Sequence, residues 1–292
     1  MADVLVLGAD GTLGHVAARV LARRFDTIVT ARRASETALG FDATDGDPEL
    51  RALLARVRPG GMVLNAVAVL ATDASEQARE RVLAVNAVFP HRLARIAQER
   101  DLRVVHISTD AVFPHDAGEC RETDRIGPED LYGLSKAEGE ISGPNTVTIR
   151  CSLIGPPAAA RARGLWAWIA SEGKGATIRG YVNQIWGGVT TLQLAHVCAA
   201  LVDGATFERA REHGPIHHLA PNRPLSKFEL VRTLAAILRP DLSVVEARGP
   251  VDVTRVLASR YQTLDRLSPH YSDWKDAIAA SAHECIRQHE VC

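Results

Sequence analysis

The stretch Val4-Leu-Val-Leu-Gly-Ala-Asp-Gly-Thr-Leu-Gly14 decides the fold of this 292-residue chain. Its apolar start, Val4 to Leu7, predicts a buried strand. The residues that follow place apolar side chains at i, i+3, i+4, i+7 and i+8, which predicts a helix over about residues 13–21. A strand, a G-x-x-G-x-x-G turn and a helix therefore follow one another.

The three glycines of this turn each suit a different task in binding a dinucleotide. Gly8 allows a tight turn, Gly11 lets the backbone approach a pyrophosphate, and Gly14 lets helix and strand pack closely. An ordinary glycine-rich turn has the same pattern, but its place directly after the first strand of a βα series favours the dinucleotide site. The expected cofactor contacts here are Gly8, Asp10, Gly11, Thr12, Leu13 and Gly14.

Strands and helices alternate through the first half of the chain. Asp47 and Pro48 predict the N-cap and first position of a helix that runs to about Val57, and Pro90 predicts a disturbance within a helical stretch over about 75–100. Repeated βα units predict an α/β fold, a doubly wound parallel sheet of the Rossmann type with ligands at the carboxyl ends of its strands. The further strands are expected at 27–31, around Phe41, and at 62–65, 103–108 and 146–150.

The break at Gly155-Pro156-Pro157 suggests two parts of unequal size. We expect a dinucleotide-binding Rossmann domain over residues 1–154 and a smaller, mainly substrate-binding domain over residues 155–292. Within the second part, about 186–212 is expected to return to the Rossmann core. Helices are expected at about 165–171, 191–202, 226–238 and 272–288.

Composition excludes several classes of function. The 34 Lys and Arg residues nearly balance 35 Asp and Glu residues, so nucleic acid and anionic membranes are not expected partners. No apolar run reaches the roughly 20 residues of a membrane span and no signal peptide is evident, so we expect a cytoplasmic protein. The five cysteines form no C-x-x-C pair, and the neighbours His217 and His218 point to opposite faces of a predicted strand, so no metal site is expected.

The second predicted strand runs into Arg32 and Arg33, where NAD-binding proteins carry an acidic residue. Guanidinium groups suit the 2′-phosphate of NADP(H), which we therefore expect as the cofactor. Either arginine can instead simply lie in solvent at the end of the strand. Asp42, after the third strand, either contacts the adenine or caps a loop.

Tyr132-Gly-Leu-Ser-Lys136 places a phenol and an ammonium on one face of a helix, where the cation favours the phenolate and makes a tunable acid and base. Tyr271-Ser-Asp-Trp-Lys275 has the same spacing. Only Tyr132 belongs to the helix expected after the fifth strand, so it is the predicted catalytic tyrosine and Tyr271 is interpreted as packing. Ser108 and Thr109, ending that strand, can offer hydroxyls to a carbonyl oxygen, or simply form a turn.

The order of these motifs resembles the extended short-chain dehydrogenase/reductase family. Three strings resemble its dTDP-4-dehydrorhamnose reductase branch, and weaker similarity extends over nearly the whole chain. Departures at Val69-Leu70 and Ala111 concern the expected contacts with substrate hydroxyls. The three strings are His106-Ile-Ser-Thr-Asp-Ala-Val-Phe113, Glu122-Thr-Asp124 and Tyr132-Gly-Leu-Ser-Lys136.

The resemblance implies an NADP(H)-dependent enzyme that reduces a keto group on a nucleotide-linked 6-deoxysugar. It implies that Thr109 hydrogen-bonds the substrate carbonyl, that Tyr132 donates the proton, and that Lys136 holds the nicotinamide ribose and lowers the tyrosine pKa. The family often pairs through helices of the Rossmann part, which is compatible with a homodimer. By the same analogy, the cofactor is lined or supported by Asn65, Ala66, Val67 and Asn86.

The substrate contacts and the reaction leave alternatives open. Arg161, Arg163 and Arg179 can grip a diphosphate or lie in solvent, and Trp166 can wall a nucleotide base or belong to the core. An epimerase or dehydratase of the same family would keep its cofactor bound, so net consumption of NADPH separates it from a reductase. A regulatory subunit that senses the dinucleotide is a third hypothesis, disfavoured by the intact Thr109, Tyr132 and Lys136.

Overall fold

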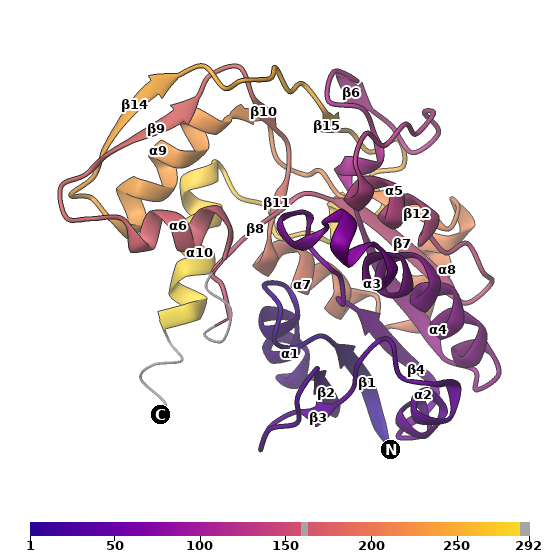
Figure 1. Ribbon diagram of the computed structural model, residues 1–292. Coiled ribbons are helices and arrows are strands. Elements are labelled where there is room, and N and C mark those ends of the chain that lie inside the picture. Colours follow the sequence, from indigo (N-terminus) through magenta and orange to yellow (C-terminus); the bar gives the residue numbers. More distant parts are fainter. Residues whose placement is uncertain (159–162, 287–292) are drawn as a thin grey trace.

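A computed structural model describes residues 1–158 and 163–286 of the chain. Its centre is a seven-stranded sheet in the order β12-β7-β5-β4-β1-β2-β3 (Figure 1). Every neighbouring pair of these strands is parallel, as predicted for a doubly wound fold. The strands are β1 (Ala2–Leu7), β2 (Thr27–Ala31), β3 (Leu39–Gly40), β4 (Val57–Asn65), β5 (Arg103–Thr109), β7 (Thr146–Cys151) and β12 (Ile216–His218).

Helices cover both faces of this sheet. Side chains alternate along a strand, so Val4 and Val6 join one buried cluster with α1 and α7, whereas Leu5 and Leu7 join another with α2 and α4. The helices of the described residues are α1 (Gly14–Ala22), α2 (Asp47–Leu54), α3 (Arg79–Leu83), α4 (Phe89–Gln98), α5 (Leu131–Glu138), α6 (Gly164–Ser171), α7 (Thr191–Ala200), α8 (Gly204–Glu212), α9 (Lys227–Leu238) and α10 (Trp274–Ile286).

The boundary between α2 and β4 differs from the prediction. Gly46, rather than Asp47, is the N-cap of α2, and the Asp47 carboxylate accepts hydrogen bonds from Arg92 and Arg95. The strand begins at Val57, where the helix was expected to end, because Val57 pairs with Ala2 of β1.

The predicted disturbance near Pro90 is confirmed, and its form is a π-helical turn over Ala84–Val88 directly before α4. Proline has no N–H to donate to the carbonyl four residues earlier, that of Asn86, and its ring would crowd this oxygen in a regular helix. The turn instead brings the Asn86 carbonyl so close to Gly139 that a Cβ there would lie 1.9 Å from the oxygen. Helix α5 can therefore end directly against this turn.

The second half carries a smaller apolar cluster beneath α6, α9 and α10. It contains three of the four tryptophans, Trp166, Trp186 and Trp274. Residues Val189 to Ala210, by contrast, contribute to the cluster on β1 and α1. The short strands outside the central sheet pair with one another: β6 (Glu119–Cys120), β8 (Leu153–Ile154), β9 (Thr177–Tyr181), β10 (Ile185–Trp186), β11 (Val189–Thr190), β13 (Leu225–Ser226), β14 (Ser243–Ala247) and β15 (Val256–Leu257).

The two neighbouring histidines of β12 are both held by backbone carbonyls. His217 Nε2 lies 3.0 Å from the oxygens of Ala210 and Gly214, and His218 Nδ1 lies 3.0 Å from that of Ala258. Within residues 1–158 and 163–286, no group of three or more His, Cys, Asp or Glu side chains is placed to hold a metal ion. Over the same residues, no helix combines the length and the apolar character that crossing a membrane requires.

Candidate active site

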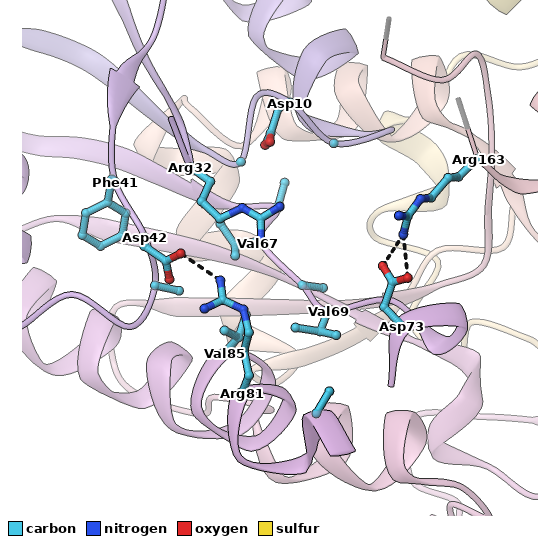
Figure 2. Close-up of a pocket in the computed structure, with 16 residues that line it drawn as sticks. Asp10, Arg32, Phe41, Asp42, Val67, Val69, Asp73, Arg81, Val85 and Arg163 are labelled. Atoms are coloured by element: carbon cyan, nitrogen blue, oxygen red, sulfur yellow. Dashed lines mark hydrogen bonds and ion pairs between the residues drawn. The ribbon is translucent and has the colours of Figure 1, made fainter. Parts of the chain in front are cut away.

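A cavity of about 350 Å³ opens at the carboxyl ends of β1, β2 and β4 (Figure 2). This is the edge of the sheet where parallel α/β proteins bind their ligands. Seven of the predicted cofactor residues line the cavity: Gly8, Asp10, Gly11, Arg32, Asp42, Ala66 and Val67. Further lining residues are Phe41, Ala43, Ala68, Val69, Asp73, Ala78, Arg81, Val85 and Arg163.

The glycine turn is shaped as a cradle that side chains would fill. Gly8 has a φ of +85°, a conformation that favours glycine, and a Cβ on it would lie 3.1 Å from the Val67 side chain. A Cβ on Gly14 would lie only 2.0 Å from the Gly8 carbonyl oxygen. The neighbouring Leu13 is buried in the core and does not line the cavity, and neither does Thr12. The backbone of this turn therefore fits a dinucleotide, whereas the Leu13 side chain serves packing.

Replacing Gly14 by alanine should open this turn, because the new methyl group cannot occupy a point 2.0 Å from a carbonyl oxygen. We expect the free energy of unfolding to fall by roughly 1–3 kcal/mol, as for other overpacked sites, and NADPH affinity to fall with it. Thermal unfolding and titration calorimetry measure the two effects. Gly173→Ala is the matched control, because a Cβ on Gly173 meets nothing within 4 Å. Equal losses of stability and NADPH affinity in the two variants would show that close packing of the turn at Gly14 does not matter.

The two arginines that follow β2 are placed differently. Both are exposed, but only Arg32 lines the cavity. Asp42 faces the same end of the cavity and accepts a hydrogen bond of 2.8 Å from Arg81 on α3 (Figure 2). Burial alone would raise the pKa of Asp42, but hydrogen bonds from Thr44 and Arg81 outweigh burial and lower the pKa to about 2. The carboxylate is therefore charged and already paired with a cation.

Arg163, the N-cap residue of α6, reaches across the cavity to Asp73 (Figure 2). One guanidinium nitrogen donates to Asp73 Oδ1 at 2.6 Å. Both side chains remain about half exposed, so this ion pair links the two halves of the chain with little net stabilisation.

Thr109, at the end of β5, interacts with Tyr132 on α5, and the Thr109 hydroxyl also donates to Asp110 Oδ1 at 3.1 Å. Tyr132 is partly buried on α5; burial raises its pKa to about 12, and a hydrogen bond with Thr109 opposes the rise. Lys136, one helical turn further, is 2% exposed and donates from Nζ to the Ile107 carbonyl at 2.6 Å. Burial lowers the pKa of Lys136 to about 8, against the charge of Glu140. The phenol is thus a proton donor at neutral pH, with a titratable amine beneath it.

Ser108 does not join this group, which corrects its assignment as a catalytic residue. Its hydroxyl donates to Glu140 Oε1 at 2.7 Å. The same carboxylate accepts two hydrogen bonds of 2.7 Å from Arg150, so the hydroxyl completes a buried ion pair. The Ser108 hydroxyl is therefore part of a buried ion pair, whereas the Thr109 hydroxyl donates to the partly buried carboxylate of Asp110 at 3.1 Å.

The two predicted asparagines support the site from beneath and do not line the cavity. Asn86 is fully buried, accepts from the N–H of Val69 at 2.8 Å, and donates to the Val69 carbonyl and to Ser135. Since Val69 lines the cavity and Ser135 lies on α5, Asn86 joins the cavity wall to the helix of Tyr132. Asn65 accepts from the N–H of Val67 and contacts His106. In this structure both side chains support the wall of the cavity without entering its lining, and Tyr132 and Lys136 also lie outside that lining.

Of the three predicted substrate contacts that lie among the described residues, only Arg163 reaches the cavity. Trp166 is 6% exposed and packs in the core of the second half, so it does not wall a base. Arg179 is exposed on β9, which pairs with β14 away from the cavity. Arg161 lies outside the described residues.

Sequence reasoning missed Arg81 and His106. Arg81 carries no local signal, because its partner Asp42 lies 39 positions earlier in the chain. His106 did carry a local signal, since it is the single polar side chain in the run Val104-Val105-His106-Ile107. A polar group in a fully buried strand must find a partner, and that requirement points to a neighbouring functional group.

The parallel sheet, the glycine turn and the Tyr-x-x-x-Lys helix together define an extended short-chain dehydrogenase/reductase. Residues 1–255 match the family model described as the RmlD substrate binding domain, and the chain belongs to that family. It is 28% identical over 300 residues to dTDP-4-dehydrorhamnose reductase of Mycolicibacterium smegmatis, covering 94% of this chain and 83% of that protein.

Solved structures share the fold over nearly its full length. A dTDP-4-dehydrorhamnose reductase of Bacillus anthracis, crystallised with NADP, superposes with a TM-score of 0.78 at 18% identity, covering 97% of this chain and 99% of the other. DesIV of Streptomyces venezuelae, a dTDP-glucose 4,6-dehydratase solved with NAD, has a TM-score of 0.71 at 18% identity, covering 99% and 98%. The predicted fold class is confirmed, and it is shared by reductases and dehydratases.

Proposed function

We propose that the protein is an NADP(H)-dependent reductase of a keto group, at C4, on a nucleotide-linked 6-deoxysugar. The observation that carries this proposal is the meeting of Tyr132 with Thr109 at the end of β5, above the buried Lys136. The reductase names of relatives that align over most of the chain support the substrate class. The presence of Arg32 in the cavity, with no acidic side chain on β2, supports the phosphorylated cofactor.

The roles follow from the chemistry of each side chain. Bound NADPH, held by the backbone at Gly8 and Gly11 and by Arg32, would supply a hydride to the carbonyl carbon. Thr109 donates a hydrogen bond to the carbonyl oxygen, and Tyr132 delivers the proton to that oxygen as negative charge develops on it. A phenol whose pKa is about 12 holds its proton until the substrate oxygen becomes basic enough to take it. Charged Lys136 stabilises the phenolate that remains.

The test is a panel of nucleotide-linked 4-keto-6-deoxysugars incubated with NADPH, with loss of NADPH absorbance and the stereochemistry of the product as readouts. Stoichiometric consumption of NADPH is the expected result. Conversion of the sugar without net consumption would identify an epimerase or dehydratase. Tight binding of NADPH with no conversion of any sugar would identify a regulatory protein. Either of these two results would overturn the proposal.

The preference for NADPH should depend on Arg32 more than on Arg33. Only Arg32 lines the cavity, so Arg32→Ala should raise the Kd for NADPH roughly tenfold, the effect of one charge-assisted contact that solvent partly screens. The Kd for NADH should hardly change, because NADH lacks the 2′-phosphate. Titration calorimetry at low and high salt measures both, with Arg33→Ala as the matched control. Equal losses for NADPH and NADH would show that neither arginine reads the phosphate.

A further inference from the structure

His106 connects the cavity wall to the buried amine of Lys136. Its side chain, fully buried on β5, has Nδ1 3.0 Å from Asn65 Nδ2 and Nε2 3.4 Å from Lys136 Nζ. Asn65 Oδ1 in turn accepts from the backbone N–H of Val67, at 3.2 Å. Four groups from β4, β5 and α5 therefore form one chain of contacts, and Val67 at its far end lines the cavity.

The direction of hydrogen bonding along this chain follows from the backbone N–H of Val67. The backbone N–H of Val67 can only donate, so the amide oxygen of Asn65 faces it and the amide nitrogen faces His106. Since Asn65 Nδ2 donates to Nδ1, the proton of a neutral ring lies on Nε2. The other tautomer would require rotation of the Asn65 amide, which would set two donors against each other.

The ring is neutral because of its surroundings. Burial lowers the pKa of His106 well below its ordinary value, and Lys136 lowers it further whenever the amine is protonated. The Nε2–H group therefore points at Lys136 Nζ, which already donates to the Ile107 carbonyl at 2.6 Å. An amine can accept a hydrogen bond only when it has a lone pair, which means only in its uncharged form.

We propose that His106 is a positioning residue for Lys136: when the amine is uncharged, the Nε2–H of His106 donates to Nζ and holds it against β5, and when the amine is protonated two donors face each other. A hydrogen bond to the neutral form opposes protonation. His106 thereby adds to burial in lowering the pH below which Lys136 becomes an ammonium. The consequence for turnover rests on the proposed function, in which the charged form of Lys136 is the active one.

Other titratable groups around Lys136 do not supply this effect. Tyr132, on the same helix, is neutral because its pKa is about 12, and burial raises the pKa of the Cys151 thiol on β7, which keeps it neutral as well. Glu140 favours the charged amine, but its carboxylate is committed to Arg150. His106 is thus the group whose removal should favour the ammonium.

Two NMR measurements on the whole protein test the proposal without any substrate. The ¹⁵N shifts of His106 report its tautomer directly, and we expect a proton on Nε2. The ¹³Cε titration of Lys136 is tractable because the chain has four lysines, and we expect a midpoint near pH 8. In His106→Phe, which keeps a ring and removes the donor, the midpoint should rise by about one unit.

Two further variants make the result specific. His106→Gln keeps a donor at the position of Nε2 and should leave the midpoint near that of the wild type. His217→Phe removes another buried histidine, held only by backbone carbonyls on β12, and should not move the lysine midpoint. A proton on Nδ1 of the wild-type ring, or an unmoved midpoint in His106→Phe, would overturn the proposal. If His106→Phe does not fold, the wild-type tautomer and the His106→Gln titration decide it.

The pH profile of NADPH oxidation supplies the kinetic readout. Activity should fall above about pH 8 in the wild type as the ammonium is lost, and in His106→Phe this fall should move upward with the Lys136 midpoint. A protein with the expected tautomer and titration that reduces none of the sugars would refute the proposed function alone. An active reductase with a proton on Nδ1 would refute the role of His106 alone.

Discussion

Tyr132→Phe should lower the kcat for sugar reduction by roughly two to four decades, the usual contribution of a positioned proton donor. The variant loses only the hydroxyl that meets Thr109, while the ring continues to fill its place on α5. The Kd for NADPH should therefore stay close to that of the wild type. Stopped assays of NADPH oxidation give kcat, and titration calorimetry gives the Kd.

Tyr271→Phe is the matched control. Tyr271 precedes α10, so it and Lys275 do not share a helical face, and its ring packs against the cluster of the second half. Its loss of a hydroxyl should leave kcat unchanged. If Tyr132→Phe kept more than about a tenth of the wild-type kcat, or if the two variants exchanged their effects, Tyr132 would not be the proton donor.

Arg150→Met should produce the largest loss of stability among the substitutions considered, about 3–5 kcal/mol in the free energy of unfolding. Arg150 and Glu140 are 4% and 5% exposed, and two hydrogen bonds of 2.7 Å join them. The guanidinium also lies over the Phe113 ring, at 5.2 Å from its centroid. Removing the guanidinium leaves the buried Glu140 carboxylate with the hydrogen bond from Ser108, which does not neutralise its charge, so the loss of stability is large. Chemical denaturation measures it.

The double variant Arg150→Met with Glu140→Gln should recover a substantial part of this loss, because no uncompensated charge then remains buried. Arg79→Met is the surface control. Its ion pair with Glu76 is about half exposed on each side and should contribute no more than about 1 kcal/mol. Equal losses of stability in Arg150→Met and Arg79→Met would show that burial does not make breaking the Arg150–Glu140 pair more costly.

The parts of the site that lie within one local motif were predictable, whereas the parts that cross between elements were not. The glycine turn follows from the steric needs of one short stretch, and the Tyr132–Lys136 spacing follows from one helix. By contrast, Arg32 and Arg33 look equivalent along the sequence, and only the position of the cavity separates them. Ser108 and Thr109 look equivalent too, but the Ser108 hydroxyl donates to the buried Glu140 and the Thr109 hydroxyl to the partly buried Asp110.

The sequence by itself determined the parallel sheet, its glycine-rich turn and the tyrosine–lysine helix, because the spacing of apolar residues and glycines acts over a few neighbouring positions. Only the tertiary structure decided that Trp166 is core, that Asn86 holds α5 to the cavity wall, and that His106 faces Lys136. Burial and hydrogen-bond partners depend on which strands and helices meet, and those meetings join residues tens of positions apart. The reactive groups of the site therefore follow from local motifs, whereas their burial and their hydrogen-bond partners depend on packing.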